Sequence, residues 1–114
     1  MKEKAMREVI LAQLGALHAD AGVELVACKD TCVSDYLTGK ADALAVAMQM
    51  VESKALIESM VHFLRHEETR NMNMAESARL CSKDTMARLR EGAAAGYMAA
   101  SRVVTEVMEA NKYE

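Results

Sequence analysis

The sequence predicts a small all-α protein, and its composition carries that prediction. The 114 residues include ten methionines and only five glycines, with no proline. Methionine favours helices, and alanine, which is frequent here, favours them most; proline and glycine interrupt them. Hydrophobic residues make up 52% of the chain and charged residues 27%, which is typical of a folded domain and not of a disordered chain. We therefore expect one domain over residues 1–114, an antiparallel bundle of three to five helices.

The first helix is expected over residues 3–21, ending near Gly22. Apolar residues recur there at spacings of three and four: Met6, Val9, Ile10, Leu14, Leu17 and Ala21. The basic start resembles a signal peptide, but Glu3 and Glu8 dilute the charge and the apolar run is short. We interpret this segment as a helix of the mature protein.

Residues 24–33 allow two interpretations. Val23, Leu25 and Ala27 alternate like a short strand, whereas Leu25, Cys28 and Cys32 keep a helical period. No second strand candidate exists to pair with a lone strand, so a short helix is favoured.

The longest helix is expected over residues 35–68, with Ser34 or Asp35 as its N-cap. It carries two apolar stripes on nearly opposite sides, which indicates two packing neighbours. A kink or short break would be least surprising at residues 52–54, and a true break is expected at residues 71–73.

The last helix, over residues 84–111, shows an uninterrupted heptad repeat. Its seam consists of Met86, Leu89, Ala93, Gly96, Ala100, Val103, Val107 and Ala110. Gly92 and Gly96 each cost about 0.8–1.0 kcal/mol in a helix interior, which close approach of a second backbone would offset. That backbone belongs either to this chain or to another copy. A helix of 28 residues is about 42 Å long, which favours a homodimer through this seam.

Glu58, His62 and His66 follow each other at four-residue spacing and project from one side of a helix. Two histidines at this spacing can chelate zinc. However, no glutamate directly follows the first histidine and no distant third ligand is evident. We therefore expect no metal and no cofactor, and we expect a pH-responsive polar patch with at least one ring partly shielded by a neighbouring helix.

Residues 75–92 are the candidate for DNA binding, because their second half has the composition of a recognition helix. Lys83, Thr85, Arg88 and Arg90 would contact the DNA. The segment before them is one or two residues too short for a helix-turn-helix, and the following helix is too long. The net charge of −3 also offers no long-range attraction to phosphate.

Three cysteines, an odd number, indicate reduced, partly buried thiols in the cytoplasm. The sequence contains no phosphate loop or nucleophile motif, so we do not expect an enzyme. The methionines indicate an adaptable surface, with Met72 and Met74 hard to bury unless a partner covers them. The sequence therefore favours a protein that binds an unidentified protein, as an adaptor, regulator or inhibitor, and a DNA-binding regulator is the alternative.

Overall fold

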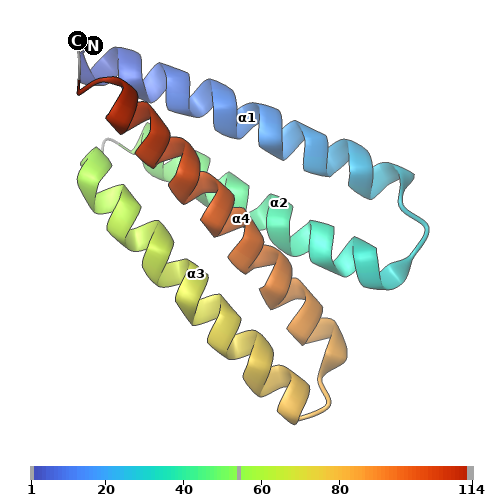
Figure 1. The fold of residues 1–114 in the computed structure, drawn as a ribbon. Coiled ribbons are helices and arrows are strands. Elements are labelled where there is room, and N and C mark those ends of the chain that lie inside the picture. The colour runs from blue at the N-terminus through green and yellow to red at the C-terminus, as the bar shows by residue number, and fades with distance from the viewer. Residues whose placement is uncertain (1, 54, 113–114) are drawn as a thin grey trace.

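Four helices pack together in a computed structural model that describes residues 2–53 and 55–112 (Figure 1). They are α1 (Glu3–Ala27), α2 (Thr31–Glu52), α3 (Ile57–Leu80) and α4 (Asp84–Ala110). The described residues contain no strand, so the predicted all-α class is confirmed. The molecule is elongated, with extents of 49 × 29 × 22 Å.

Helix α4 is the central element, because α2 and α3 both pack along it (Figure 1). Helix α1 packs mainly on α2, and α2 barely touches α3. Fully buried side chains come from all four helices, and the largest of the apolar ones are Ile10, Leu14, Leu44, Met60, Leu64 and Val104. The core is therefore arranged around α4.

The predicted helix over residues 24–33 does not exist. Helix α1 continues to Ala27, and a three-residue turn separates it from α2. The Asp30 carboxylate caps α2 by accepting hydrogen bonds from the backbone N–H groups of Cys32, at 2.8 Å, and Val33, at 3.2 Å. Since such a cap satisfies N–H groups that the first helical turn leaves unpaired, α2 begins here and not at Ser34 or Asp35.

The predicted helix over residues 35–68 is two helices. Helix α2 ends at Glu52 and α3 begins at Ile57, so the two apolar stripes belong largely to different helices. Arg7 of α1 stabilises the connection, because its guanidinium donates hydrogen bonds to the carbonyl oxygens of Val51, at 3.0 Å, and Ala55. The Val51 carbonyl lies in the last turn of α2, where a helix end leaves acceptors unpaired, and Ala55 lies in the connection itself.

The predicted break at residues 71–73 is also wrong, because α3 continues without interruption to Leu80. The Asn71 amide Nδ2 donates to the Glu67 backbone carbonyl at 2.8 Å, one helical turn earlier. Its polar side chain is thereby satisfied inside the helix, and Asn71 is only 2% exposed.

Helices α2 and α4 approach each other closely at three glycines. A Cβ atom on Gly39 would overlap the Leu89 carbonyl oxygen, and one on Gly92 would overlap that of Tyr36. A Cβ atom on Gly96 would lie 2.6 Å from the Lys40 carbonyl oxygen. The low helix propensity of Gly92 and Gly96 is therefore offset by close contact between two backbone segments of the same chain.

This contact corrects the predicted use of the seam on α4. Gly92, Gly96, Ala100, Val103 and Val107 are buried inside the single chain. A second copy could not pack its backbone against the two glycines unless α2 moved away. The buried part of the seam is consequently an intramolecular contact, whereas Met86 and Ala110 at its ends are exposed.

We expect Gly92→Ala to destabilise the protein by about 2–3 kcal/mol, because its methyl group has no room beside the Tyr36 backbone. The matched control is Gly22→Ala in α1, where a Cβ atom meets nothing within 4 Å. That change should stabilise the protein by about 0.5–1 kcal/mol, since alanine is the better helix residue. Urea unfolding followed by circular dichroism measures both, and equal effects of the two substitutions would contradict the close contact.

Candidate functional site

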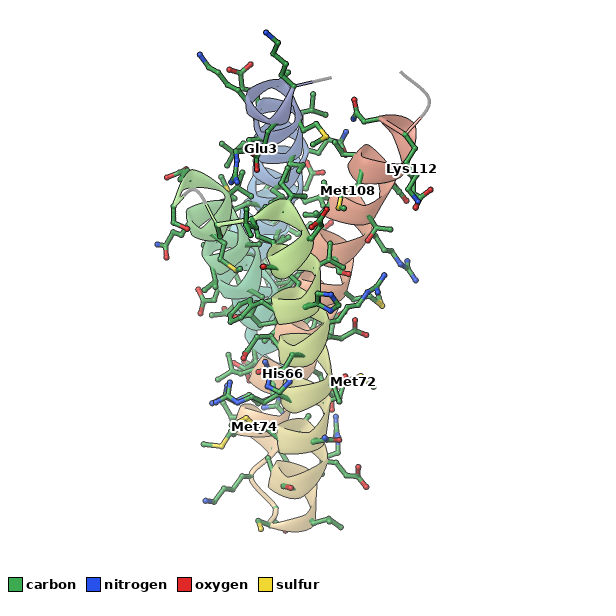
Figure 2. The ribbon with its side chains drawn as sticks, turned by 90° about the vertical axis from the view of Figure 1, so that its left-hand side faces the viewer. Glu3, His66, Met72, Met74, Met108 and Lys112 are labelled. Atoms are coloured by element: carbon green, nitrogen blue, oxygen red, sulfur yellow. The ribbon has the colours of Figure 1, made fainter. Side chains whose placement is uncertain are left out.

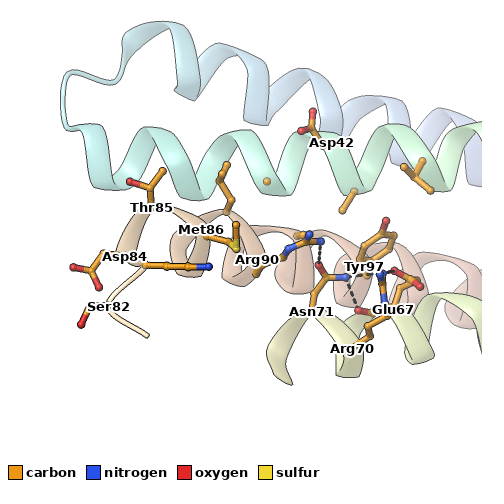
Figure 3. Close-up of a pocket in the computed structure, with 16 residues that line it drawn as sticks. Asp42, Glu67, Arg70, Asn71, Ser82, Asp84, Thr85, Met86, Arg90 and Tyr97 are labelled. Atoms are coloured by element: carbon orange, nitrogen blue, oxygen red, sulfur yellow. Dashed lines mark hydrogen bonds and ion pairs between the residues drawn. The ribbon is translucent and has the colours of Figure 1, made fainter. Parts of the chain in front are cut away.

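A groove of about 740 Å³ lies between α2 and α3. It exists because both helices pack on α4 and barely contact each other, so α4 forms its floor (Figure 3). Leu89 and Ala93 of α4, Val46 of α2 and Met86 at the start of α4 contribute apolar surface. We call this hollow the α2–α3 groove.

A polar network joins the floor of the groove to α3 (Figure 3). The Arg90 guanidinium donates to Asn71 Oδ1 at 3.2 Å, and Asn71 Nδ2 donates to the Glu67 backbone. Glu67 in turn forms an ion pair with Arg70 at 3.0 Å. Because Asn71 is almost fully buried and bonded on both sides, it fixes the position of the Arg90 guanidinium at the groove.

Tyr97 also lines the α2–α3 groove and is only 8% exposed. Burial raises the pKa of its phenol, and the nearby Glu67 carboxylate raises it further, while Arg70 and Arg90 oppose the shift. The phenol is therefore a neutral hydrogen-bonding group in the groove at ordinary pH.

Charges of both signs line the groove in equal number. Lys83, Arg70 and Arg90 are basic, and the acidic lining residues are Asp42, Glu67 and Asp84. The groove thus has no strong net potential, and its polar groups are suited to orienting a ligand with an apolar surface.

The residues predicted to bind DNA lie together near the beginning of α4, but the two arginines among them already have partners on other helices. Arg88 donates to the Asp35 carboxylate of α2 from Nε at 3.1 Å and from Nη2 at 3.0 Å. This hydrogen bond raises the pKa of the arginine above its ordinary value. Arg90 donates to Asn71, whereas Lys83 and Thr85 are exposed.

The connection inside residues 75–92 is a tight helical hairpin. Ser82 adopts a positive φ of 59°, and the Lys83 N–H donates to the Ala78 carbonyl at 2.8 Å. This left-handed residue and its hydrogen bond are typical of a helix C-terminus that reverses the chain. Helices α3 and α4 then lie side by side (Figure 1), whereas a helix-turn-helix crosses at a wide angle.

The three residues considered as possible metal ligands lie on the surface of α3. Glu58, His62 and His66 are all exposed, and His66 lies on the outer face of α3 in Figure 2. The expectation that a neighbouring helix shields at least one ring is wrong, because both histidines are exposed. The described residues also contain no group of three His, Cys, Asp or Glu side chains placed to hold a metal ion.

The cysteines lie in or beside the turn between α1 and α2 and the turn between α3 and α4. Cys28 is half-buried, whereas Cys32 and Cys81 are exposed, which corrects the expectation of partly buried thiols. Cys28 and Cys32 flank the turn from α1 to α2, and Cys81 follows α3. Figure 1 shows both turns at the end of the molecule away from the chain termini, with the α1–α2 turn apart from the α3–α4 turn, so Cys81 lies away from Cys28 and Cys32.

Most of the described methionines lie at the edges of the core. Met60 alone among them is buried, while Met72 and Met86 are exposed. Met72 and Met74 point to different sides of α3 (Figure 2). Met74 is half-buried and lines a small second hollow with Met86, next to the α2–α3 groove.

The sequence did not identify Asn71 or Tyr97 as site residues. One signal for Asn71 was available: it follows Leu64 by seven positions and precedes Ala75 by four, and both neighbours are buried. A polar residue at a core-facing position of a helix is unusual and requires a buried partner. Arg90 of another helix is that partner, which spacing alone does not reveal.

Searches of protein-family models, curated proteins and solved structures find no match to this chain. Helix α1 is long and apolar enough to cross a membrane by length and composition, and few residues of its most apolar window are buried. This is weak evidence, since core helices and signal sequences have the same composition.

The raised pKa of Tyr97 predicts a loss of stability at high pH. An unfolded tyrosine titrates near pH 10, so above that pH the unfolded chain releases a proton that the folded chain retains. The stability contribution is complete below about pH 10 and is lost as the pH rises through the folded-state pKa. The free energy of unfolding should therefore fall more steeply above pH 10 for wild type than for Tyr97→Phe. Parallel pH profiles would contradict this assignment, and absorbance of the tyrosinate gives the midpoint independently.

Proposed function

We propose that this protein is a non-catalytic binding module that accepts an amphipathic helix of a partner protein in the α2–α3 groove. The observation that carries the proposal is the open groove itself, whose floor is α4 and whose walls are two helices that do not close over it. The residues that line it include no histidine and no cysteine. Since histidine is the most frequent general base, its absence from this lining favours binding over catalysis.

The shape and chemistry of the groove suit a helix. Its apolar surface runs from Met86 across Leu89 to Ala93, at spacings of three and four along α4. An amphipathic helix presents apolar side chains at the same periodicity and binds grooves of this type through positions i, i+3 or i+4, and i+7. Exposed and half-buried methionines beside the groove can adapt their shape to such a ligand.

The charge of Arg90 predicts one feature of the partner. No carboxylate of the described residues pairs with Arg90, and Asn71 holds its guanidinium at the groove. A guanidinium in this position can donate further hydrogen bonds to an acidic side chain. We therefore expect the bound helix to carry an Asp or Glu that contacts Arg90.

DNA binding through residues 75–92 is less well supported. Arg88 is paired with Asp35, and Arg90 is bonded to Asn71, so two of the four proposed contacts are engaged within the protein. The exposed thiols of Cys32 and Cys81 favour a cytoplasmic location for the protein, since thiols remain reduced in that compartment.

Selection from a displayed library of amphipathic helices tests the proposed function. Helices selected on wild type should bind Met86→Glu at least ten-fold more weakly, because a carboxylate would enter the apolar wall. Met86 is 47% exposed, so the substitution should leave the fold intact. The control is Leu56→Glu, an equally charged change at an exposed residue that does not line the groove.

A selection that yields no binder, or binders that both variants accept equally, would contradict the groove as the binding site. Binding to a random DNA duplex that falls steeply from low to moderate salt would favour the alternative.

A further inference from the structure

Helix α1 buries only one of its two apolar faces. Ile10, Leu14 and Ala21 are buried against the rest of the chain. The opposite side carries a continuous exposed stripe with spacings of four, three, four and three residues: Ala12, Ala16, Ala19, Val23 and Val26. Val23 is 71% exposed and Val26 is 89% exposed. We call these five residues the outer stripe of α1.

The outer stripe continues toward the N-terminus in the same heptad pattern. Val9 and Ala5, both half-buried, occupy the next two positions of the repeat. Such a pattern over three heptads is typical of a helix that pairs with another helix. The other described helices of this chain pack on the opposite side, so none of them supplies the partner.

We propose that the outer stripe binds the same stripe of a second copy of this chain, with the two α1 helices running in opposite directions. The charges of α1 support this occupant. Lys2 and Lys4 are exposed at its beginning, whereas Asp20 and Glu24 are exposed in its last two turns. Opposite directions place the end of each helix that carries Lys2 and Lys4 beside the acidic end of the other. Glu3, which pairs with Arg7 of its own helix, and Glu8 depart from this division.

The side-chain sizes also fit a reversed copy. When Ala12 of one copy faces Ala16 of the other, Val9 faces Ala19 and Ala5 faces Val23. Val9 and Val23 then each meet an alanine, so the gap between the helices stays even from residue 5 to residue 23, and Val26 lies opposite Lys2 beyond this stretch. The same residues contribute from both copies, and the two-fold arrangement closes on itself as a dimer.

This surface is independent of the α2–α3 groove, because no residue of α1 lines the groove. Self-association through α1 therefore goes beyond the proposed function and can be tested without any partner.

Analytical ultracentrifugation of the full chain tests the proposal. Wild type should sediment as a dimer at about 50 µM, and Ala16→Glu should raise the dissociation constant at least 100-fold, because two carboxylates would enter the centre of the interface. The matched control is Ser77→Glu on α3, an exposed position on a helix that does not contact α1. Circular dichroism shows that each variant is folded.

Disulfide cross-linking tests the direction of the helices. In a background with Cys28, Cys32 and Cys81 replaced by serine, Ala5→Cys and Val23→Cys should cross-link to each other when the two variants are mixed. Ala5→Cys alone should not form a disulfide dimer, because about 18 residues, or 27 Å of helix, would separate its two copies.

Three results would overturn the proposal. They are a wild type that remains monomeric, an Ala16→Glu variant that dimerises like wild type, and an Ala5→Cys variant that cross-links to itself. Cosedimentation of monomeric wild type with phosphatidylcholine vesicles, lost in Ala16→Glu, would assign the outer stripe to a lipid surface instead.

Discussion

The close contact between α2 and α4 determines the rest of the architecture. Gly39, Gly92 and Gly96 let the two backbones touch, so α2 is fixed against one side of α4. Helix α3 must use another side of α4, where Asn71 and Arg90 are joined. Because α2 is held so tightly, α3 cannot also pack along it, and the α2–α3 groove follows from this geometry.

Buried and half-buried arginines link helices that are distant in the sequence. Arg7 joins α1 to the end of α2, Arg88 joins α4 to Asp35 of α2, and Arg90 joins α4 to Asn71 of α3. Each guanidinium therefore contributes to positioning a helix. Only Arg90 does so at the surface of the groove without a carboxylate partner among the described residues, which makes it the group best placed to recognise a ligand.

The sequence predicted features that depend on local periodicity and missed those that depend on distant contacts. The helix expected over residues 84–111 ends within one residue of α4, and its glycines correctly indicated a close backbone approach. A kink or short break was anticipated at residues 52–54, where α2 ends, but its contact with Arg7 of another helix was missed because spacing alone does not reveal it. The groove was missed for the same reason, since it depends on how two helices diverge from α4.

Occupation of both the α2–α3 groove and the outer stripe of α1 would affect how tightly a partner binds. A dimer formed through the outer stripe of α1 leaves the α2–α3 groove of each copy open, because the two surfaces share no residue. Two grooves held at a fixed separation bind a partner with two suitable helices more tightly than one groove does, since the second contact becomes intramolecular. Loss of the dimer would then weaken binding to a two-helix partner and leave binding to a single helix unchanged. This difference separates the contribution of α1 from that of the groove, because it requires no change in any residue that contacts the bound helix.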